Sequence, residues 1–284
     1  MIKNQQSKII VILSFFLVIF TFVASYFGVF VSDTYSRETL NWAAQAIGQD
    51  AVNLFLIVPL LIILSILVYR KNRIAVLLWS GVMVYLVYSY AIYGFATHFN
   101  NLFLIYCLVF GFSFYAFMYF LYTHINEPIA EWFSDKVPVK IVGVYLIIIA
   151  SLFYFLWLSA IVPAILTDTI PQDIVDAGLL TNPVYVLDLS IVLPGFILTA
   201  ILLLKRRSLG LLLAPVTLVL SILMPVAIAG TILVMNIRGV ASSLAVIPLM
   251  GLLALISAIM LTMYLRSIKR NARIAQNGGI IEHG

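Results

Sequence analysis

Eight long apolar runs constrain this chain more than any other feature. A helix rises 1.5 Å per residue, so about 20 apolar residues cross the roughly 30 Å hydrocarbon core of a bilayer. Between charged or polar breaks, runs of this length cover residues 9–31, 52–69, 74–95, 102–123, 141–162, 184–204, 209–235 and 240–265. The sequence therefore predicts an all-α, polytopic membrane protein with eight transmembrane helices.

Composition supports this fold class and excludes others. Hydrophobic residues make up 64% of the 284 positions and charged residues 10%, against roughly 45–50% and 25% in soluble domains. Disordered chains are poor in apolar residues and rich in charge, which is the opposite of this composition, so disorder is excluded. The single cysteine, Cys107, rules out an intramolecular disulfide and a thiolate zinc cluster.

The basic residues fall mainly on one side of the predicted bundle. With a cytoplasmic N-terminus, fourteen Lys and Arg lie inside and two, Arg37 and Arg238, lie outside. This asymmetry follows the positive-inside rule through all eight helices. We expect a cell-membrane protein with both termini cytoplasmic and the lipid bilayer as its surroundings, and we expect no nucleic-acid partner despite the net charge of +5.

The chain also resembles itself at an ungapped offset of 135 residues. The offset places Ser32-Asp33-Thr34 on Thr167-Asp168-Thr169, Asn53 on Asp188, Pro59 on Pro194, Arg70-Lys71 on Lys205-Arg206 and Asn101 on Asn236. We interpret this as two parallel four-helix repeats, related by an axis along the membrane normal. The expected units are a first repeat over 1–123, a cytoplasmic interfacial linker over 124–140, a second repeat over 141–266 and a cytoplasmic tail over 267–284.

Short segments outside the eight runs have patterns of their own. Leu40, Ala43, Ala44 and Ile47 have the spacing of a short amphipathic helix that starts near Ser36, stops at Gly48 and places Trp42 near the headgroups. Its weaker copy extends over 171–178. In the linker, the segment after Asn126 directs Ile129, Trp132 and Phe133 toward lipid or protein. The outer loops are expected to carry Asp33, Glu38, Asp50, Asp168, Asp173 and Asp176.

Asp188 is the main candidate for chemistry, because it lies five residues after Pro183 inside a predicted span. A carboxylate at such a position is costly unless it is paired or neutral. It is either a proton or cation site facing its repeat mate Asn53, or a structural group satisfied by Ser190, Tyr185 or a neighbouring helix. In the first case burial without a cation would favour protonation.

Further candidates come from a polar and aromatic stripe. Gly81, Tyr85, Ser89 and Tyr93 recur every four residues in the third run, with Tyr88 beside them. The stripe either faces a cavity or makes interhelical hydrogen bonds and part of an aromatic belt, and the same alternatives hold for Tyr115, Tyr119 and Tyr122.

His98 follows this stripe in a short outer turn. It either caps an outward pocket over Asp188 or is an ordinary interfacial histidine. We expect no metal site and no cofactor, because histidine neighbours of the right kind are missing around it.

Named enzyme motifs are absent from the sequence, including HExxH, GxSxG and the P-loop. The segments 88–95, 98–103 and 187–190, together with Pro194, resemble a functionally uncharacterised family of bacterial polytopic integral membrane proteins. That resemblance implies a bacterial cytoplasmic membrane and adds no substrate, cofactor or catalytic residue.

Two functional hypotheses follow. The first is a non-enzymatic transporter or permease-like protein, in which a site at the repeat interface, open to the outer side, binds a small or lipophilic ligand. The helix-breaking prolines and outward polar positions favour it. The alternative is a membrane-embedded accessory or sensory subunit that acts through a membrane protein partner.

The topology can be tested by cysteine labelling of intact cells in a Cys107-free background. We expect an impermeant maleimide to label Asp33→Cys and Asp168→Cys, and to leave Lys71→Cys and Arg206→Cys unlabelled until the cells are permeabilised. The reverse pattern would place the termini outside.

Overall fold

The computed structural model describes residues 4–269, and its architecture is helical. The α-helices are α1 (Asn4–Phe30), α2 (Leu40–Val52), α3 (Val58–Tyr69), α4 (Arg73–Ala96), α5 (Phe103–His124), α6 (Val139–Leu166), α7 (Gln172–Ala177), α8 (Pro183–Leu187), α9 (Leu193–Leu204), α10 (Ser208–Ile237) and α11 (Val246–Leu265). Among these residues, eight continuous helices are long and apolar enough to cross a membrane. The expected eight-helix membrane protein is confirmed at this level.

Seven of the eight spans begin and end within six residues of the predicted runs, and the second does not. It extends from Leu40 to Tyr69 as one continuous helix. The prediction of a separate surface helix from Ser36 to Gly48 is therefore wrong. Thr39, whose hydroxyl accepts from the Trp42 backbone N–H at 3.2 Å, caps the helix instead of Ser36, and the chain continues helically through Gly48. Trp42 is buried.

The copy of that segment in the second half is built differently. Residues Gln172–Ala177 form the short helix α7, and Gly178 ends it in the left-handed conformation with φ of 70°. Asn182 then caps α8 by accepting from the Val184 N–H at 2.9 Å. Where the first half has one continuous helix, the second half therefore has a short helix, a turn and the start of a new helix. The short helix expected over 171–178 is confirmed by α7.

Two π-helical turns interrupt the second and sixth spans just before a proline. They are η2 (Asn53–Ile57), which precedes Pro59, and η4 (Asp188–Val192), which precedes Pro194. Proline has no N–H and cannot continue the α-helical ladder. A wider turn shifts the hydrogen-bond register ahead of it, and such turns are frequent at functional sites. The turns begin at the two polar positions, Asn53 and Asp188, that the sequence offset pairs.

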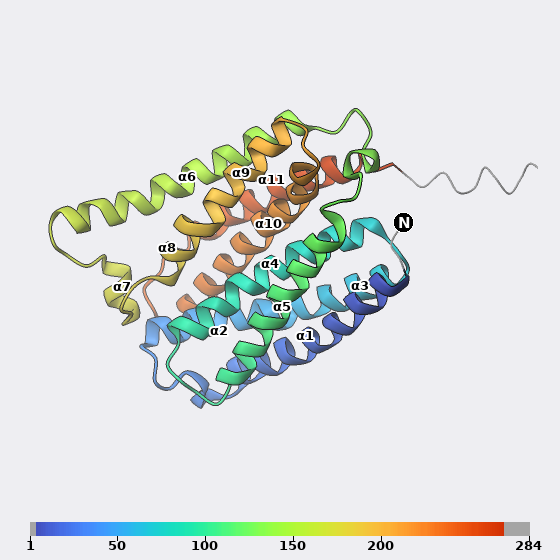
Figure 1. Cartoon of the computed structure of the whole chain (residues 1–284). Helices are drawn as coiled ribbons and strands as arrows, with labels where there is room; N and C mark the ends of the chain where they lie inside the picture. Colours follow the sequence, from blue (N-terminus) through green and yellow to red (C-terminus); the bar gives the residue numbers. More distant parts are fainter. Residues whose placement is uncertain (1–3, 270–284) are drawn as a thin grey trace, which may run out of the picture.

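Helices α4 and α10 form the centre of the bundle (Figure 1). Inside the structure, 78% of the most apolar window of α4 and 72% of that of α10 are buried, against 39% or less for the other six spans. Helices α1, α3 and α5 lie on one side of this central pair and α6, α9 and α11 on the other. The two sides meet where α2 and α4 pack on α10 and where α8 packs on α4.

We call the end of the bundle with the turns at 70–72 and 205–207 the basic end, and the end with 31–39, 97–102 and 167–182 the loop end. At the basic end, the linker contains the 3-10 helix η3 (Ile129–Trp132). Ile129, Trp132 and Phe133 are all buried, so they face protein. Arg73 lies over the Trp132 ring, 5.0 Å from its centroid.

The start of the predicted tail pairs with the linker. The Ser134 N–H donates to the Ser267 carbonyl at 2.8 Å, and the Lys269 N–H donates to the Trp132 carbonyl at 2.8 Å. The rest of the tail, 270–284, lies outside the described residues, as do Lys3, Arg270 and Arg273, which contributed to the charge count.

The contact between α2 and α10 predicts one stability effect. A Cβ at Gly48 would lie 2.5 Å from the Thr231 Cα and 2.9 Å from the Gly230 carbonyl oxygen, which are backbone atoms that cannot rotate away. Gly48→Ala should therefore lower the free energy of unfolding by about 1–3 kcal/mol through overpacking. Thermal unfolding in detergent would measure this.

Gly111→Ala in α5 is the matched control, because among the described residues its Cβ meets no atom within 4 Å. Alanine also has the higher helix propensity. Equal unfolding temperatures for the two variants would contradict the close approach of α2 and α10.

Candidate functional site

A cavity of about 430 Å³ lies between the two sides of the bundle. Helices α2 and α4 supply one wall, and α6 through α11 supply the other. Its lining residues on α4 and α10 come from the parts of those helices nearest the loop end, and Thr97, Leu179 and Asn182 extend it to that end. Most of the remaining lining is apolar, including Ile149, Phe153, Phe196, Leu220, Met224, Ile228, Ile232 and Leu253. The cavity therefore suits an apolar body with a few polar anchors.

Asp188 lines this cavity and is only 7% exposed. The Trp157 indole Nε1–H of α6 donates to its Oδ2 atom at 2.8 Å. Trp157 also packs on Tyr185, with ring centroids 5.1 Å apart. The neighbouring helix that satisfies the carboxyl is thus α6, whereas the Ser190 hydroxyl donates to the Val186 carbonyl of its own helix.

The Tyr88 hydroxyl faces Asp188 from α4, across the junction of the two sides. It is buried and has no hydrogen-bond partner among residues 4–269. An unpaired buried hydroxyl costs about 1–3 kcal/mol. A polar ligand group placed between Tyr88 and Asp188 would satisfy both.

Asn53 and Tyr85 do not line the cavity; they lie behind lining residues of α2 and α4 and hydrogen-bond to them. The Tyr85 hydroxyl donates to Asn53 Oδ1 at 3.0 Å, and both side chains are fully buried. Gln49, which lines the cavity, donates to the Tyr85 hydroxyl at 2.5 Å and approaches the Ser89 hydroxyl at 3.5 Å. Asn53 thus belongs to a polar group in the α2–α4 wall, opposite the wall that holds Asp188, and does not itself line the cavity.

The rest of the stripe divides by position. Ser89 and Tyr93 line the cavity with Tyr88, while Gly81 packs against Val219 of α10. In the second stripe, Tyr115 and Tyr122 are 71% and 81% exposed. That stripe lies on the outer surface of α5, where the aromatic-belt interpretation applies.

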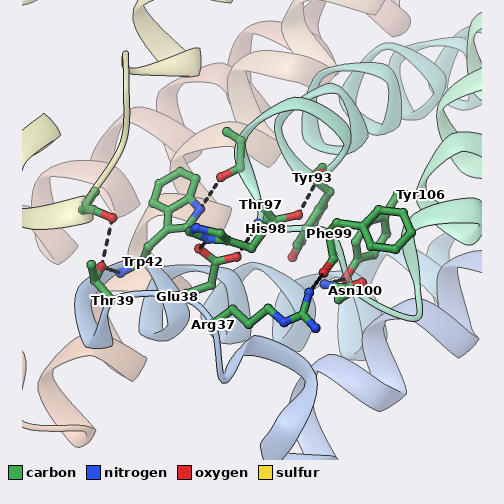
Figure 2. Close-up of polar contacts among 12 residues, drawn as sticks. Arg37, Glu38, Thr39, Trp42, Tyr93, Thr97, His98, Phe99, Asn100 and Tyr106 are labelled. Carbon is green, nitrogen blue, oxygen red and sulfur yellow. Dashed lines mark hydrogen bonds and ion pairs between the residues drawn. The ribbon is translucent and has the colours of Figure 1, made fainter.

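His98 lies outside the cavity lining, in a set of contacts that closes the loop end (Figure 2). Its backbone N–H donates to Glu38 Oε1 at 2.6 Å, and its Nδ1 lies 2.8 Å from Glu38 Oε2. The side chain of His98 is 59% exposed and that of Glu38 3%. The idea that His98 caps Asp188 therefore lacks support in the geometry, because Glu38 holds it.

Three further contacts join the start of α2 to its surroundings (Figure 2). Arg37 donates to the Phe99 carbonyl at 2.7 Å, Trp42 Nε1 donates to the Ala96 carbonyl at 2.8 Å, and Thr39 donates to the Ala177 carbonyl at 2.9 Å. Together with the Glu38–His98 pair, we call these the loop-end contacts. They fix the cavity's rim by tying α2 to the α4–α5 turn and to α7.

Asp50 is the residue that sequence reasoning misplaced. It was expected in an outer loop, but it lies in α2 and is fully buried. The Tyr35 hydroxyl donates to its Oδ2 atom at 2.5 Å. Burial, with the Asp50 carboxyl nearby, raises the pKa of Tyr35 well above its usual value, so this phenol is a neutral donor at all ordinary pH. The tyrosines at 35, 90, 93 and 106 could have signalled a buried polar partner.

The charge of the cavity is one-sided. Of the described residues that line it, Asp188 and Asp173 are acidic and none is basic. Within residues 4–269, no group of three His, Cys, Asp or Glu side chains is placed to hold a metal ion.

No protein-family model, no curated protein and no solved structure matches this chain. Function must therefore be argued from the site itself.

The loop-end contacts predict a local change in dynamics. Glu38→Ala removes the acceptor of the His98 backbone N–H, so amide exchange across 97–101 should become about tenfold faster, equivalent to about 1.4 kcal/mol. Hydrogen–deuterium exchange mass spectrometry would measure it. Asp33→Ala, at the same end but bonded only to neighbouring residues, is the control. Equal exchange in both variants would show that Glu38 does not hold the turn.

Proposed function

We propose that this chain is a non-enzymatic, transporter or permease-like protein of the cell membrane. Its cavity binds a small lipophilic ligand that enters from the outer side. The observation that carries the proposal is a largely apolar cavity between the two sides of an eight-helix bundle, with the buried Asp188 in its wall. Ligand sites of membrane transporters commonly lie between structural halves, where helices are interrupted.

The lining favours a particular ligand class. Two carboxyl groups with no basic residue beside them, in the described part of the chain, disfavour an anion. Tyr88 and Asp188 offer a hydroxyl and a carboxyl on facing walls, which suit an ammonium or another hydrogen-bond donor. The proposed ligand is therefore a lipophilic cation or an amphiphile with a donor group.

The proposed duplication is supported by the bounds of the helices. At the offset of 135 residues, α3 corresponds to α9 and η2 to η4 in both start and end, and α1 and α4 start where α6 and α10 do. Lys71 and Arg206, which the offset pairs, both have positive φ, at 63° and 51°. Such backbone is uncommon outside glycine.

The cavity adds a second line of support. From α4 and its C-cap the cavity is lined by Tyr88, Ser89, Ile92, Tyr93 and Thr97. The offset carries all of these except Tyr88 onto residues of α10 that also line it, namely Met224, Ala227, Ile228 and Ile232. Two central helices that present corresponding positions to one space are what parallel repeats about an axis along the membrane normal require.

The orientation proposed from the charges places the loop end outside. The basic end carries Arg70, Lys71, Lys205 and Arg206, which the positive-inside rule assigns to the cytoplasm. Because the cavity extends to the loop end, it would then face the exterior.

Binding of a size-matched pair of hydrophobic ions tests the site. In lipid nanodiscs, tetraphenylphosphonium should bind and tetraphenylborate should not. Asp188→Asn should weaken tetraphenylphosphonium binding about tenfold or more, because the carboxyl charge is lost. Trp157→Phe should weaken it less, since it removes only the indole donor to that carboxyl. Asp176→Asn on the exposed face of α7 is the control. Equal binding of both ions, or no effect of Asp188→Asn, would overturn the ligand class.

Transport is separated from binding by uptake into proteoliposomes. Accumulation of tetraphenylphosphonium above that in protein-free liposomes supports a transporter. Binding without uptake, together with a membrane protein that co-purifies at fixed stoichiometry, would favour the accessory or sensory alternative.

A further inference from the structure

We propose that Asp50 is a proton-binding site, separate from the cavity and enclosed within the side of the bundle that contains α1, α3 and α5. The described lining of the cavity includes Gln45, Ala46 and Gln49 of α2 but not Asp50. The carboxyl therefore lies on another face of the same helix. Because it is fully buried, its charge state must be settled by the groups that enclose it.

The backbone of α1 closes directly over this carboxyl. A Cβ at Gly28 would lie 1.8 Å from Asp50 Oδ2, and 3.1 Å from the Tyr35 hydroxyl oxygen. Only a glycine permits such an approach, so α1 seals the group on one side. The Tyr35 hydroxyl, at 2.5 Å, occupies Oδ2.

The second oxygen, Oδ1, is unpaired, and so are three hydroxyl groups that lie close to Asp50 or to Tyr90. Among the described residues, Asp50 Oδ1, Ser25 Oγ, Thr21 Oγ1 and the Tyr90 hydroxyl are buried with no hydrogen-bond partner. Ser14, earlier in α1, donates to the Ile10 carbonyl of its own helix, but Thr21 and Ser25 do not. The Thr21 and Ser25 hydroxyls therefore remain available for hydrogen bonds to Asp50 and Tyr90, which lie beside α1.

Within the described part of the chain, each titratable group that faces Asp50 is a phenol. They are Tyr35 of η1 (Ser32–Tyr35), Tyr90 and Tyr93 of α4 and Tyr106 of α5. Of the other elements that pack on α2, α10 has no charged residue in its sequence, α1 has only Lys8 near its start, and α7 carries Asp173 and Asp176.

A buried carboxylate without a cation is costly, because the charged form is desolvated. A neutral carboxyl avoids that cost, and its O–H can donate to a neighbouring hydroxyl oxygen while its other oxygen accepts from Tyr35. The absence of a basic side chain among the described groups around Asp50 thus favours the protonated group over an unpaired carboxylate.

A line of polar groups joins Asp50 to the loop end. The Tyr35 and Tyr106 hydroxyl oxygens lie 3.5 Å apart, and Asn100 Nδ2 lies 3.5 Å from the Tyr106 hydroxyl oxygen. Figure 2 shows Asn100 and Tyr106 beside the loop-end contacts. Release breaks the carboxyl O–H bond and leaves a carboxylate, to which the Tyr35 hydroxyl continues to donate; the acceptor of the proton is bulk water at the loop end, toward which this line of polar groups leads.

Tyr93 stands between this site and the cavity. It lines the cavity, and its hydroxyl donates to the Ala46 carbonyl of α2 at 3.0 Å. Its ring also lies 5.1 Å from Tyr106 and 5.3 Å from Tyr90, centroid to centroid. A ligand that displaces Tyr93 would change the surroundings of Asp50. This link rests on the proposed ligand site, whereas proton binding at Asp50 does not.

Infrared spectroscopy of the full chain in nanodiscs tests the proton without any ligand. At about pH 7 the wild type should show a neutral carboxyl C=O band that Asp50→Asn removes and the exposed Asp33→Asn retains. Tyr35→Phe, which keeps the carboxyl but removes its donor, should shift the band, and it serves if Asp50→Asn does not fold. A band unchanged in both variants overturns the proposal. So does a band that sodium abolishes at constant pH, which would assign a metal cation to the site.

The link to the cavity is measured separately, as protons exchanged when tetraphenylphosphonium is added in weakly buffered solution. Asp50→Asn should bind the probe as the wild type does but exchange fewer protons, while Asp188→Asn should bind it about tenfold or more weakly. Unchanged proton exchange in Asp50→Asn would break the link. Failure of probe binding in the wild type would overturn the ligand class and leave the infrared result standing.

Discussion

The need to pair every backbone N–H and C=O inside hydrocarbon determines most of this structure. No water is available there, so a crossing segment must be a continuous helix. The eight spans obey this rule even where the sequence resists it. Pro59 and Pro194 remove a donor from their helices, and in each case a π-helical turn just before the proline shifts the register. The deviations from regular helix thus fall at two defined places, and those places begin with Asn53 and Asp188.

Hydropathy predicted the spans because this constraint acts on composition as well as on geometry. The runs could be counted, and their ends agree with those of the helices to within six residues in seven cases. The prediction for the second span failed because it counted Asp50 as a charged residue that separates two segments. Gly48 and Asp50 are residues that also favour turns, yet the apolar spacing of Leu40, Ala43, Ala44 and Ile47 continues past them into the next run. A polar break across which the helical spacing continues is better interpreted as a buried polar group.

The site was predicted in part for the same reason. Asp188 could be found by its position inside a run, and the Tyr88, Ser89 and Tyr93 positions by their helical spacing. Trp157 could not be found as the partner of Asp188, because pairing across helices depends on which faces of α6 and η4 meet, and a single sequence leaves that open. The partner of His98 could not be found for a similar reason, since the carboxyl that it contacts belongs to Glu38, sixty residues earlier in the chain.

The proposed duplication explains how one architecture holds two carboxyl groups in different surroundings. At the offset of 135 residues, Asn53 corresponds to Asp188, and Asp50 corresponds to Tyr185, which packs on Trp157. Each half therefore has one acid near its π-helical turn, but on different faces. The phenols of α4 at 85, 88 and 93 correspond to Leu220, Leu223 and Ile228 of α10. Of these phenols, Tyr88 and Tyr93 line the cavity, so the part of its wall formed by α4 is more polar than the part formed by α10, where Ser221 and Thr231 are the polar lining residues in the described chain. The proposed amphiphilic ligand would meet these unlike surfaces, which two identical repeats could not provide.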